Sequence, residues 1–344
     1  MAQSIRLTSG SLFIGSPISV TVKAENGLSN ATFHRVKLIV TAALSTDSEF
    51  QEFELSVPAS SNEEVVFDIS TALRSVVANY EYSRVSDATT YPYIAYTLKA
   101  YDEWMLNGII TEEYGVQISP SSGRYSALMG GFTARERYLS ASDTKDVTSF
   151  TRKPSTGEVC AAGEFFVYPD AVATPMKITD TITSGPSISV ATLEGSGTKT
   201  YEGRTIYVDP NTKNRLLFQF VNGYGVVETI SAEMLEGVES SGESEVDIVT
   251  APSSFKGVKQ NIVRRADREK VYKCSSGYIN REWAEWWATE FLGGDAFRRS
   301  GHSQCWVLMD GNWIPCTIES DEDINIYDRA KPSLTHVDFE MRLL

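Results

Sequence analysis

Alternating apolar and polar positions dominate the first third of the chain and predict β-strands. Residues 35–41 place Val36, Leu38 and Val40 on one face, and residues 50–57 alternate in the same way. One segment departs from this period: between residues 69 and 80 the apolar side chains recur at helical spacings of three and four. The pattern therefore predicts a mainly β region that contains one short crossover helix.

Two short turn sequences predict β-hairpins. Asn107-Gly108 and Asp310-Gly311-Asn312 both combine residues that accept positive φ angles, as type I′ turns require. Each turn lies between two strand-like runs, at residues 96–106 and 109–118 and at residues 305–309 and 313–318.

The clearest helical pattern in the chain lies at residues 279–292. Its aromatic side chains recur at spacings of three and four and share one face, and Gly293-Gly294 ends the pattern. The apolar face consists of Ile279, Trp283, Trp286, Trp287 and Phe291. Our main prediction is that this face packs on a C-terminal sheet. The alternative is an anchor for another subunit, since Trp is enriched at interface hot spots.

These patterns together predict a mainly β protein of three units. We expect an N-terminal β-sandwich domain at residues 1–125 and a middle β-rich domain at residues 126–255. Residues 256–344 should form a small C-terminal α+β unit that contains the Trp-rich helix.

Composition narrows the functional classes. The 344 residues include 31 Lys and Arg against 45 Asp and Glu, which gives a net charge of −14. This balance argues against broad attraction to nucleic acid or to an anionic membrane, because both need a basic face. No run of about 18 apolar residues and no export signal are evident, so we expect no membrane insertion. Four cysteines are too few for a disulfide scaffold and fit reduced thiols.

No motif for catalysis or cofactor binding is evident. His302-x-x-Cys305, with Cys316 and Cys274, could be drawn as a zinc site, but isolated core cysteines are the commoner explanation. The acidic stretch that begins at Asp321 lacks the glycine and the final glutamate of a calcium loop. Nucleotide-binding loops and a serine nucleophile elbow are missing too. We therefore predict a non-enzymatic protein without metal or cofactor. A glycan hydrolase ranks third, after the structural and the glycan-binding functions described below.

A tyrosine-rich segment suggests a second kind of function, that of a carbohydrate-binding or adhesive module. Tyr82, Tyr91 and Tyr93 are candidates for stacking on the sugar rings of a host-surface glycan. The alternative is that tyrosine is simply a favoured strand residue.

Charge separates two neighbouring segments. Residues 228–247 hold seven acidic and no basic side chains, and residues 256–273 hold seven basic side chains against two acidic ones. The segments could face each other within one subunit, or they could steer head-to-tail contacts between identical subunits. For the second case the candidate interface residues are Glu233, Glu236, Glu239, Arg264, Arg265 and Arg268.

Three stretches of the sequence also resemble a known class of proteins. They are Phe150-Thr-Arg-Lys-Pro-Ser-Thr-Gly-Glu158, Arg215-Leu-Leu-Phe-Gln-Phe-Val-Asn-Gly-Tyr-Gly225, and residues 276–287 with the closing strands. Together they resemble tail-type structural proteins of phages and prophages from anaerobic gut bacteria. The resemblance implies a β-rich virion component of the tail or baseplate, made in the host cytoplasm. It also implies assembly as a ring or trimer with other tail proteins as partners, and it carries over no catalytic residue.

Overall fold

The computed structural model describes most of the chain, and two of its segments by their backbone alone. The described residues are 4–7, 12–24, 33–47, 49–60, 62–78, 80–113, 117–118, 124–131, 136, 146–177, 182, 184–211, 214–250, 259–293, 305–320 and 335–344. For residues 236–250 and 259–270 the description covers the backbone and its strand pairing.

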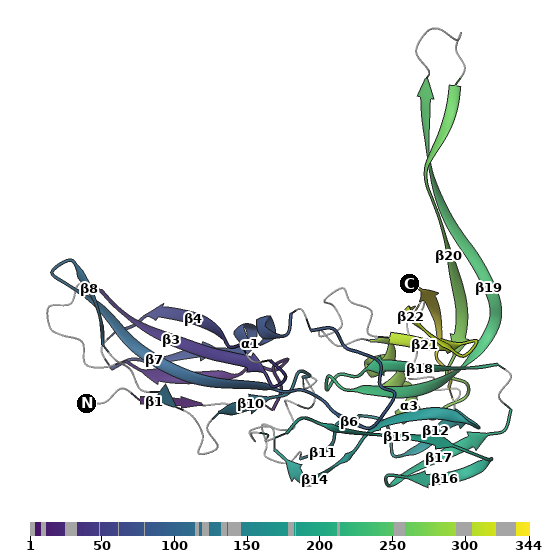
Figure 1. Ribbon diagram of the computed structural model, residues 1–344, viewed down its shortest axis with the longest axis horizontal. Coiled ribbons are helices and arrows are strands. Elements are labelled where there is room, and N and C mark those ends of the chain that lie inside the picture. Colours follow the sequence, from purple (N-terminus) through teal and green to yellow (C-terminus); the bar gives the residue numbers. More distant parts are fainter. Residues whose placement is uncertain are drawn as a thin grey trace.

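Two antiparallel sheets form the N-terminal region (Figure 1). The first has the order β1-β2-β5, with β1 (Ser4–Leu7), β2 (Ser19–Lys23) and β5 (Glu64–Asp68). The second has the order β10-β7-β3-β4, with β10 (Tyr125–Ala127), β7 (Ile94–Leu106), β3 (Phe33–Leu44) and β4 (Gln51–Pro58), while β8 (Ile109–Glu113) and β9 (Gln117–Ile118) also pair with β7. Val36, Leu38 and Val40 are fully buried, so the alternation in β3 gives the predicted inner face.

The first predicted hairpin is confirmed. Asn107 and Gly108 have φ angles of 51° and 78° and join β7 to β8, with Leu106 opposite Ile109. Both φ angles are positive, as a two-residue type I′ loop requires.

The crossover helix is shorter than its apolar pattern predicts. Helix α1 (Ser70–Val76) buries Leu73, but Tyr80 lies outside the helix. Asp68 Oδ1 accepts a hydrogen bond of 2.9 Å from the Ser70 N–H at the start. At the other end the Tyr80 N–H donates to the Val77 carbonyl, a tight turn that stops the helical ladder.

Three small sheets form the middle region. They have the orders β12-β17-β16, β13-β15-β6 and β11-β14, and β12 runs parallel to β17. The strands are β6 (Thr89–Thr90), β11 (Val147–Ser149), β12 (Thr156–Ala161), β13 (Glu164–Pro169), β14 (Ala171–Met176), β15 (Ser187–Leu193), β16 (Gly197–Tyr201) and β17 (Arg204–Asp209).

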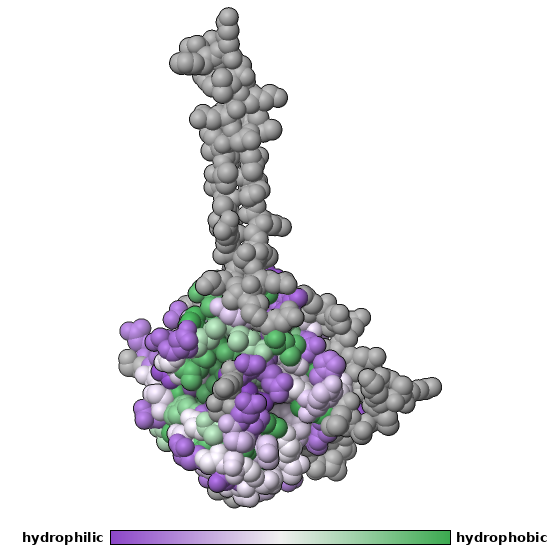
Figure 2. All heavy atoms as spheres, turned by 90° about the vertical axis from the view of Figure 1, so that its right-hand side faces the viewer, coloured by the Kyte–Doolittle hydropathy of each residue, from purple (hydrophilic) through white to green (hydrophobic). Residues whose placement is uncertain are grey.

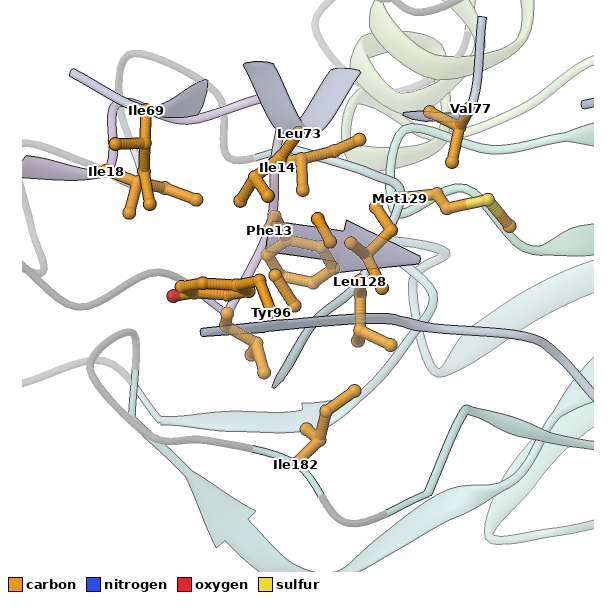
Figure 3. Close-up of a cluster of buried hydrophobic side chains, with 14 of the residues drawn as sticks. Phe13, Ile14, Ile18, Ile69, Leu73, Val77, Tyr96, Leu128, Met129 and Ile182 are labelled. Carbon is orange, nitrogen blue, oxygen red and sulfur yellow. The ribbon is translucent and has the colours of Figure 1, made fainter. Parts of the chain in front are cut away.

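The N-terminal and middle regions share one hydrophobic core. Phe13, Leu128 and Met129 converge with Ile182 of the middle region, and Tyr96 lies in the same cluster (Figure 3). The border expected near residue 125 therefore separates two sets of strands but not two cores.

A closed barrel forms the C-terminal region. Its strand order is β18-β19-β20-β23-β22-β21. The strands are β18 (Arg215–Val221), β19 (Val227–Thr250), β20 (Lys259–Ser275), β21 (Cys305–Met309), β22 (Asn312–Glu319) and β23 (Asp338–Leu343). The border expected between residues 255 and 256 is wrong, because β18 and β19 close the same barrel as the later strands and share its core. Asp310 and Gly311, with φ angles of 50° and 75°, confirm the second predicted hairpin.

The Trp-rich helix packs into the barrel core, as its main prediction states. It consists of α3 (Arg281–Trp286) and a π-helical turn, η1 (Trp287–Leu292). Asn280 caps the start, since its Oδ1 accepts a hydrogen bond from the Trp283 N–H. Phe291 lies 5.6 Å from Phe218 of β18 and 5.5 Å from Phe339 of β23, measured between ring centroids.

Candidate assembly interface

A long hairpin arm projects from the barrel (Figure 1). Strand β19 has 24 residues and β20 has 17. Only residues 227–233 of β19 pair with β18, and only residues 271–275 of β20 pair with β23. Beyond these points, within the described strands, β19 and β20 pair with each other alone. We call residues 235–250 and 259–270 the arm.

The arm exposes two backbone edges over a considerable length. Its β19 part has 16 residues, and at about 3.3 Å per residue these span roughly 50 Å. Register shifts near Glu236 and between Glu245 and Val246 interrupt the pairing, and such bulges increase the twist of a ribbon. A two-stranded hairpin alone is marginally stable in water. Unpaired strand edges are also templates for pairing with another chain.

The acidic and basic segments singled out from the sequence become the two strands of this hairpin. Their candidate residues occupy these register positions: Glu233 opposite Ser275, Glu236 opposite Lys273, Glu239 opposite Val271, Arg265 opposite Glu245 and Arg268 opposite Gly242, with Arg264 in the shift beside Arg265. The two segments do face each other within one subunit. Among the described strands, none pairs with the outer edge of either arm strand, so the interface remains a prediction.

The base of the arm is tied to the barrel and the middle region. Arg215 Nη1 lies 3.4 Å from Glu233 Oε1, and Arg215 Nε donates to Ser231 Oγ over 3.0 Å. Ser231 Oγ in turn donates to Glu164 Oε1 of β13 over 3.0 Å. Leu235, the first residue of the arm, is 51% exposed. Figure 2 shows apolar side chains among hydrophilic ones on the body below the arm. The surface beside the arm base is thus of the mixed kind found in subunit contacts.

A buried ionic cluster lies where the three regions meet. We call it the junction; its centre is Arg152, which lies between two carboxylates. Arg152 Nη2 is 2.7 Å from Glu136 Oε2, and Arg152 Nη1 is 2.7 Å from Glu290 Oε1 on η1. The guanidinium also lies 3.9 Å from the Tyr224 ring centroid, and the Tyr224 hydroxyl donates to Glu136. All donors and acceptors of this centre come from the chain itself.

A second part of the junction surrounds Lys153. Its buried ammonium donates to Glu158 and to the Thr229 carbonyl. Arg204 Nη2 lies 3.3 Å from the other oxygen of Glu158. Sequence reasoning missed this cluster, because its members are far apart along the chain. The only local signal was the basic turn at residues 150–158.

The three stretches that carry the resemblance meet at the junction. The Phe150 carbonyl accepts a hydrogen bond of 2.8 Å from Asn222, and the Thr156 carbonyl accepts one of 2.7 Å from the Trp283 indole. Gly157 has a φ of +87°, and a Cβ there would lie 3.1 Å from the Trp283 ring nitrogen. These three stretches therefore pack against one another and contribute to the stability of a single folded body.

Burial dominates the electrostatics of the junction. Glu228 is fully buried, and this raises the pKa of its carboxyl above the ordinary value of 4.5 although Lys153 attracts the charged form. Thr151 Oγ1 donates to Glu228 over 2.7 Å, and Asn222 donates to it over 3.2 Å. Burial likewise raises the pKa of Glu164. These carboxyls lie in the interior, where hydrogen bonds from the chain hold them.

Two of the three candidate sugar-stacking residues are buried. Tyr82 is 8% exposed and Tyr91 is 6% exposed, and their rings pack 6.3 Å apart between centroids. Neither offers the open ring face that sugar stacking needs, so these two assignments are wrong. The reason is that both rings fill the core shared by the N-terminal and middle regions. Tyr93 is half-buried against the same core, and its role stays a prediction.

The thiols are buried in the described part of the chain. Burial raises the pKa values of Cys160 and Cys274 to about 12. Contact with Cys305 and burial raise the pKa of Cys316. The described residues contain no group of three or more His, Cys, Asp or Glu side chains that could hold a metal ion. His302 and Asp321 lie outside the described residues.

Two comparisons found no relative: no family model matches the chain, and no curated protein matches it. Among the residues that the structure describes, no helix combines the length and apolar character needed to cross a membrane.

Proposed function

We propose that the chain is a non-enzymatic structural subunit of a phage or prophage tail or baseplate, which is made in the host bacterial cytoplasm and assembles through contacts between its copies. The observation that carries this proposal is the arm. A two-stranded ribbon with two free edges gains little from its own chain, because such hairpins are marginal alone. Pairing of its edges with another subunit would supply the missing strand neighbours.

Two further observations support the same function. The β-rich body with its buried junction suits a rigid component of a large particle. The resemblance of residues 150–158, 215–225 and 276–287 to tail-type structural proteins gives the kind of particle. Other tail proteins are the expected partners besides further copies.

Removal of the arm tests the assembly. Residues 240–270 are replaced by Asn-Gly, so that Glu239 and Val271, which are opposite each other, flank a two-residue loop. The pairing of β20 with β23 begins at Val271 and stays intact. We expect the wild type to form a defined oligomer by light scattering, and the shortened chain to be a monomer with an unchanged near-ultraviolet circular dichroism spectrum.

Salt and particle composition complete the test. The wild-type oligomer should loosen at high salt, because charges farther apart than about 10 Å are screened at 0.1 M. Mass spectrometry of purified tail particles should detect the chain. A wild type that is monomeric at every salt and concentration, or that is absent from purified particles, contradicts the proposed function.

A further inference from the structure

The two free edges of the arm carry opposite charge. Residues 235–250 of β19 include five acidic and no basic side chains. Residues 259–270 of β20 include five basic and two acidic ones, a net charge of +3. Each arm is therefore a ribbon with one acidic edge strand and one basic edge strand.

The directions of the two strands restrict how arms can meet. Strand β19 leads away from the barrel and β20 returns to it, because the two are antiparallel. When copies stand side by side with their arms pointing the same way, β20 of one copy lies next to β19 of the following copy. That pair is again antiparallel, so it can form a regular hydrogen-bonded ladder.

The charges decide between the two possible symmetries. A two-fold contact between arm edges would place β20 against β20 or β19 against β19, and both arrangements juxtapose like charges. A head-to-tail contact places the acidic β19 edge against the basic β20 edge at every step. Complementary charge selects the second arrangement, since like-charge contact disfavours the first.

We propose that the partner of the arm is the arm of a second copy of this chain. The free edge of β19 in one copy pairs antiparallel with the free edge of β20 in the next. Repetition around a closed ring then joins all the arms into one continuous antiparallel sheet without edges. This inference rests on the proposed function and adds to it the partner, the strands and the polarity of the contact.

A charge-exchange variant tests the polarity. Six substitutions exchange the charges of the two edges without changing the net charge: Glu239→Arg, Glu243→Arg, Glu245→Arg, Arg264→Glu, Arg265→Glu and Arg268→Glu. Positions 245 and 265 are opposite each other, so complementary charge within the hairpin is kept. The exchanged chain and a wild type that carries a terminal tag are co-expressed, and native mass spectrometry counts pure and mixed oligomers by the mass of the tag.

Head-to-tail pairing predicts that each chain assembles with itself and that the two chains do not mix. At a mixed contact, basic meets basic or acidic meets acidic. Mixed oligomers should therefore fall at least about tenfold below the statistical proportion, which corresponds to about 1.4 kcal/mol. The exchange of the single facing pair, Glu245→Arg with Arg265→Glu, is the matched second variant. It serves if the larger variant does not fold. This exchange weakens the charge of each edge without reversing it, so a smaller excess of unmixed over mixed oligomers is expected.

Three other results would overturn the inference, each for a different reason. Statistical mixing would mean that the arm edges do not form the contact, although the proposed assembly would stand. Preferential mixing would mean a two-fold contact between like edges. A monomeric wild type would refute the proposed function and the inference with it.

Discussion

The junction and the arm both concentrate opposite charges, but they satisfy them differently. At the junction Arg152 lies within 2.7 Å of Glu136 and of Glu290, and the ring of Tyr224 covers the guanidinium. In the arm the acidic residues lie on one strand and most of the basic residues on the other, and the outer backbone edges of these strands have no neighbour among the described strands. The charges of the junction described here are paired within one chain, whereas the arm presents backbone edges that a second chain could pair with.

This difference has a physical consequence for where charge contributes to stability. A buried charge without its partner costs several kcal/mol, because water cannot replace the missing interaction. A cross-strand charge pair on an open ribbon contributes only tenths of a kcal/mol to about 1 kcal/mol. Charges at the junction should therefore control folding, and charges on the arm should control association.

The largest expected effect is at the centre of the junction. Arg152→Met removes the guanidinium and leaves Glu136 and Glu290 buried without their cation. We expect the free energy of unfolding to fall by about 3–5 kcal/mol. Denaturant unfolding of the shortened, arm-less chain measures this without interference from assembly.

A matched control uses an exposed ion pair. Arg6 Nη2 lies 3.3 Å from Glu64 Oε2, and the two side chains are 64% and 55% exposed. Arg6→Met should cost at most about 1 kcal/mol. Equal losses in the two variants would contradict the distinction between buried and exposed charge.

An effect of intermediate size on the free energy of unfolding should depend on pH. Because burial raises the pKa of Glu228 in the folded chain, the folded state retains this proton to a higher pH than the unfolded state does. The free energy of unfolding should therefore fall as pH rises from the ordinary value of 4.5 through the raised pKa. Glu228→Gln lacks this titration. Unfolding curves of the wild type and the variant, measured over this range, should show the variant gaining relative stability as pH rises.

The opposite slope, or none, would mean that Lys153 outweighs burial at this site. Glu164→Gln is a suitable comparison, since burial also raises the pKa of Glu164.

The smallest effect on folding is expected in the arm. Arg265→Ala removes one charge from the position opposite Glu245. The free energy of unfolding should change by less than about 1 kcal/mol, while the oligomer measured by light scattering should weaken. A loss of folding stability as large as that of Arg152→Met would show that the arm belongs to the folding core.

The strand and turn chemistry could be predicted from the sequence because it is local. Alternation placed Val36, Leu38 and Val40 on a buried face, and Asn107-Gly108 carried the positive φ angles of its hairpin. The aromatic spacing in residues 279–292 likewise indicated one buried helix face. The π-helical turn that begins at Trp287 was not predicted, because it reflects how the aromatic rings pack in the barrel.

The candidate site was only half visible in the sequence. The separation of acidic and basic residues was evident, but its meaning depended on the register that joins residues 235–250 to 259–270 in one ribbon. The burial of Tyr82 and Tyr91 could not be predicted, because alternation shows which side chains share a face and not which face is covered.

The strands, the turns and the positions of charge follow from the sequence, since these depend on neighbours along the chain. Which charges are paired in the interior and which lie on the arm depends on the tertiary structure. Arg152 and Glu290 are separated by 138 positions yet hydrogen-bonded. The barrel includes the base of β19, and among the described strands the rest of β19 pairs with β20 alone. Pairing of this kind is set by the packing of distant segments, and short-range patterns carry no record of it.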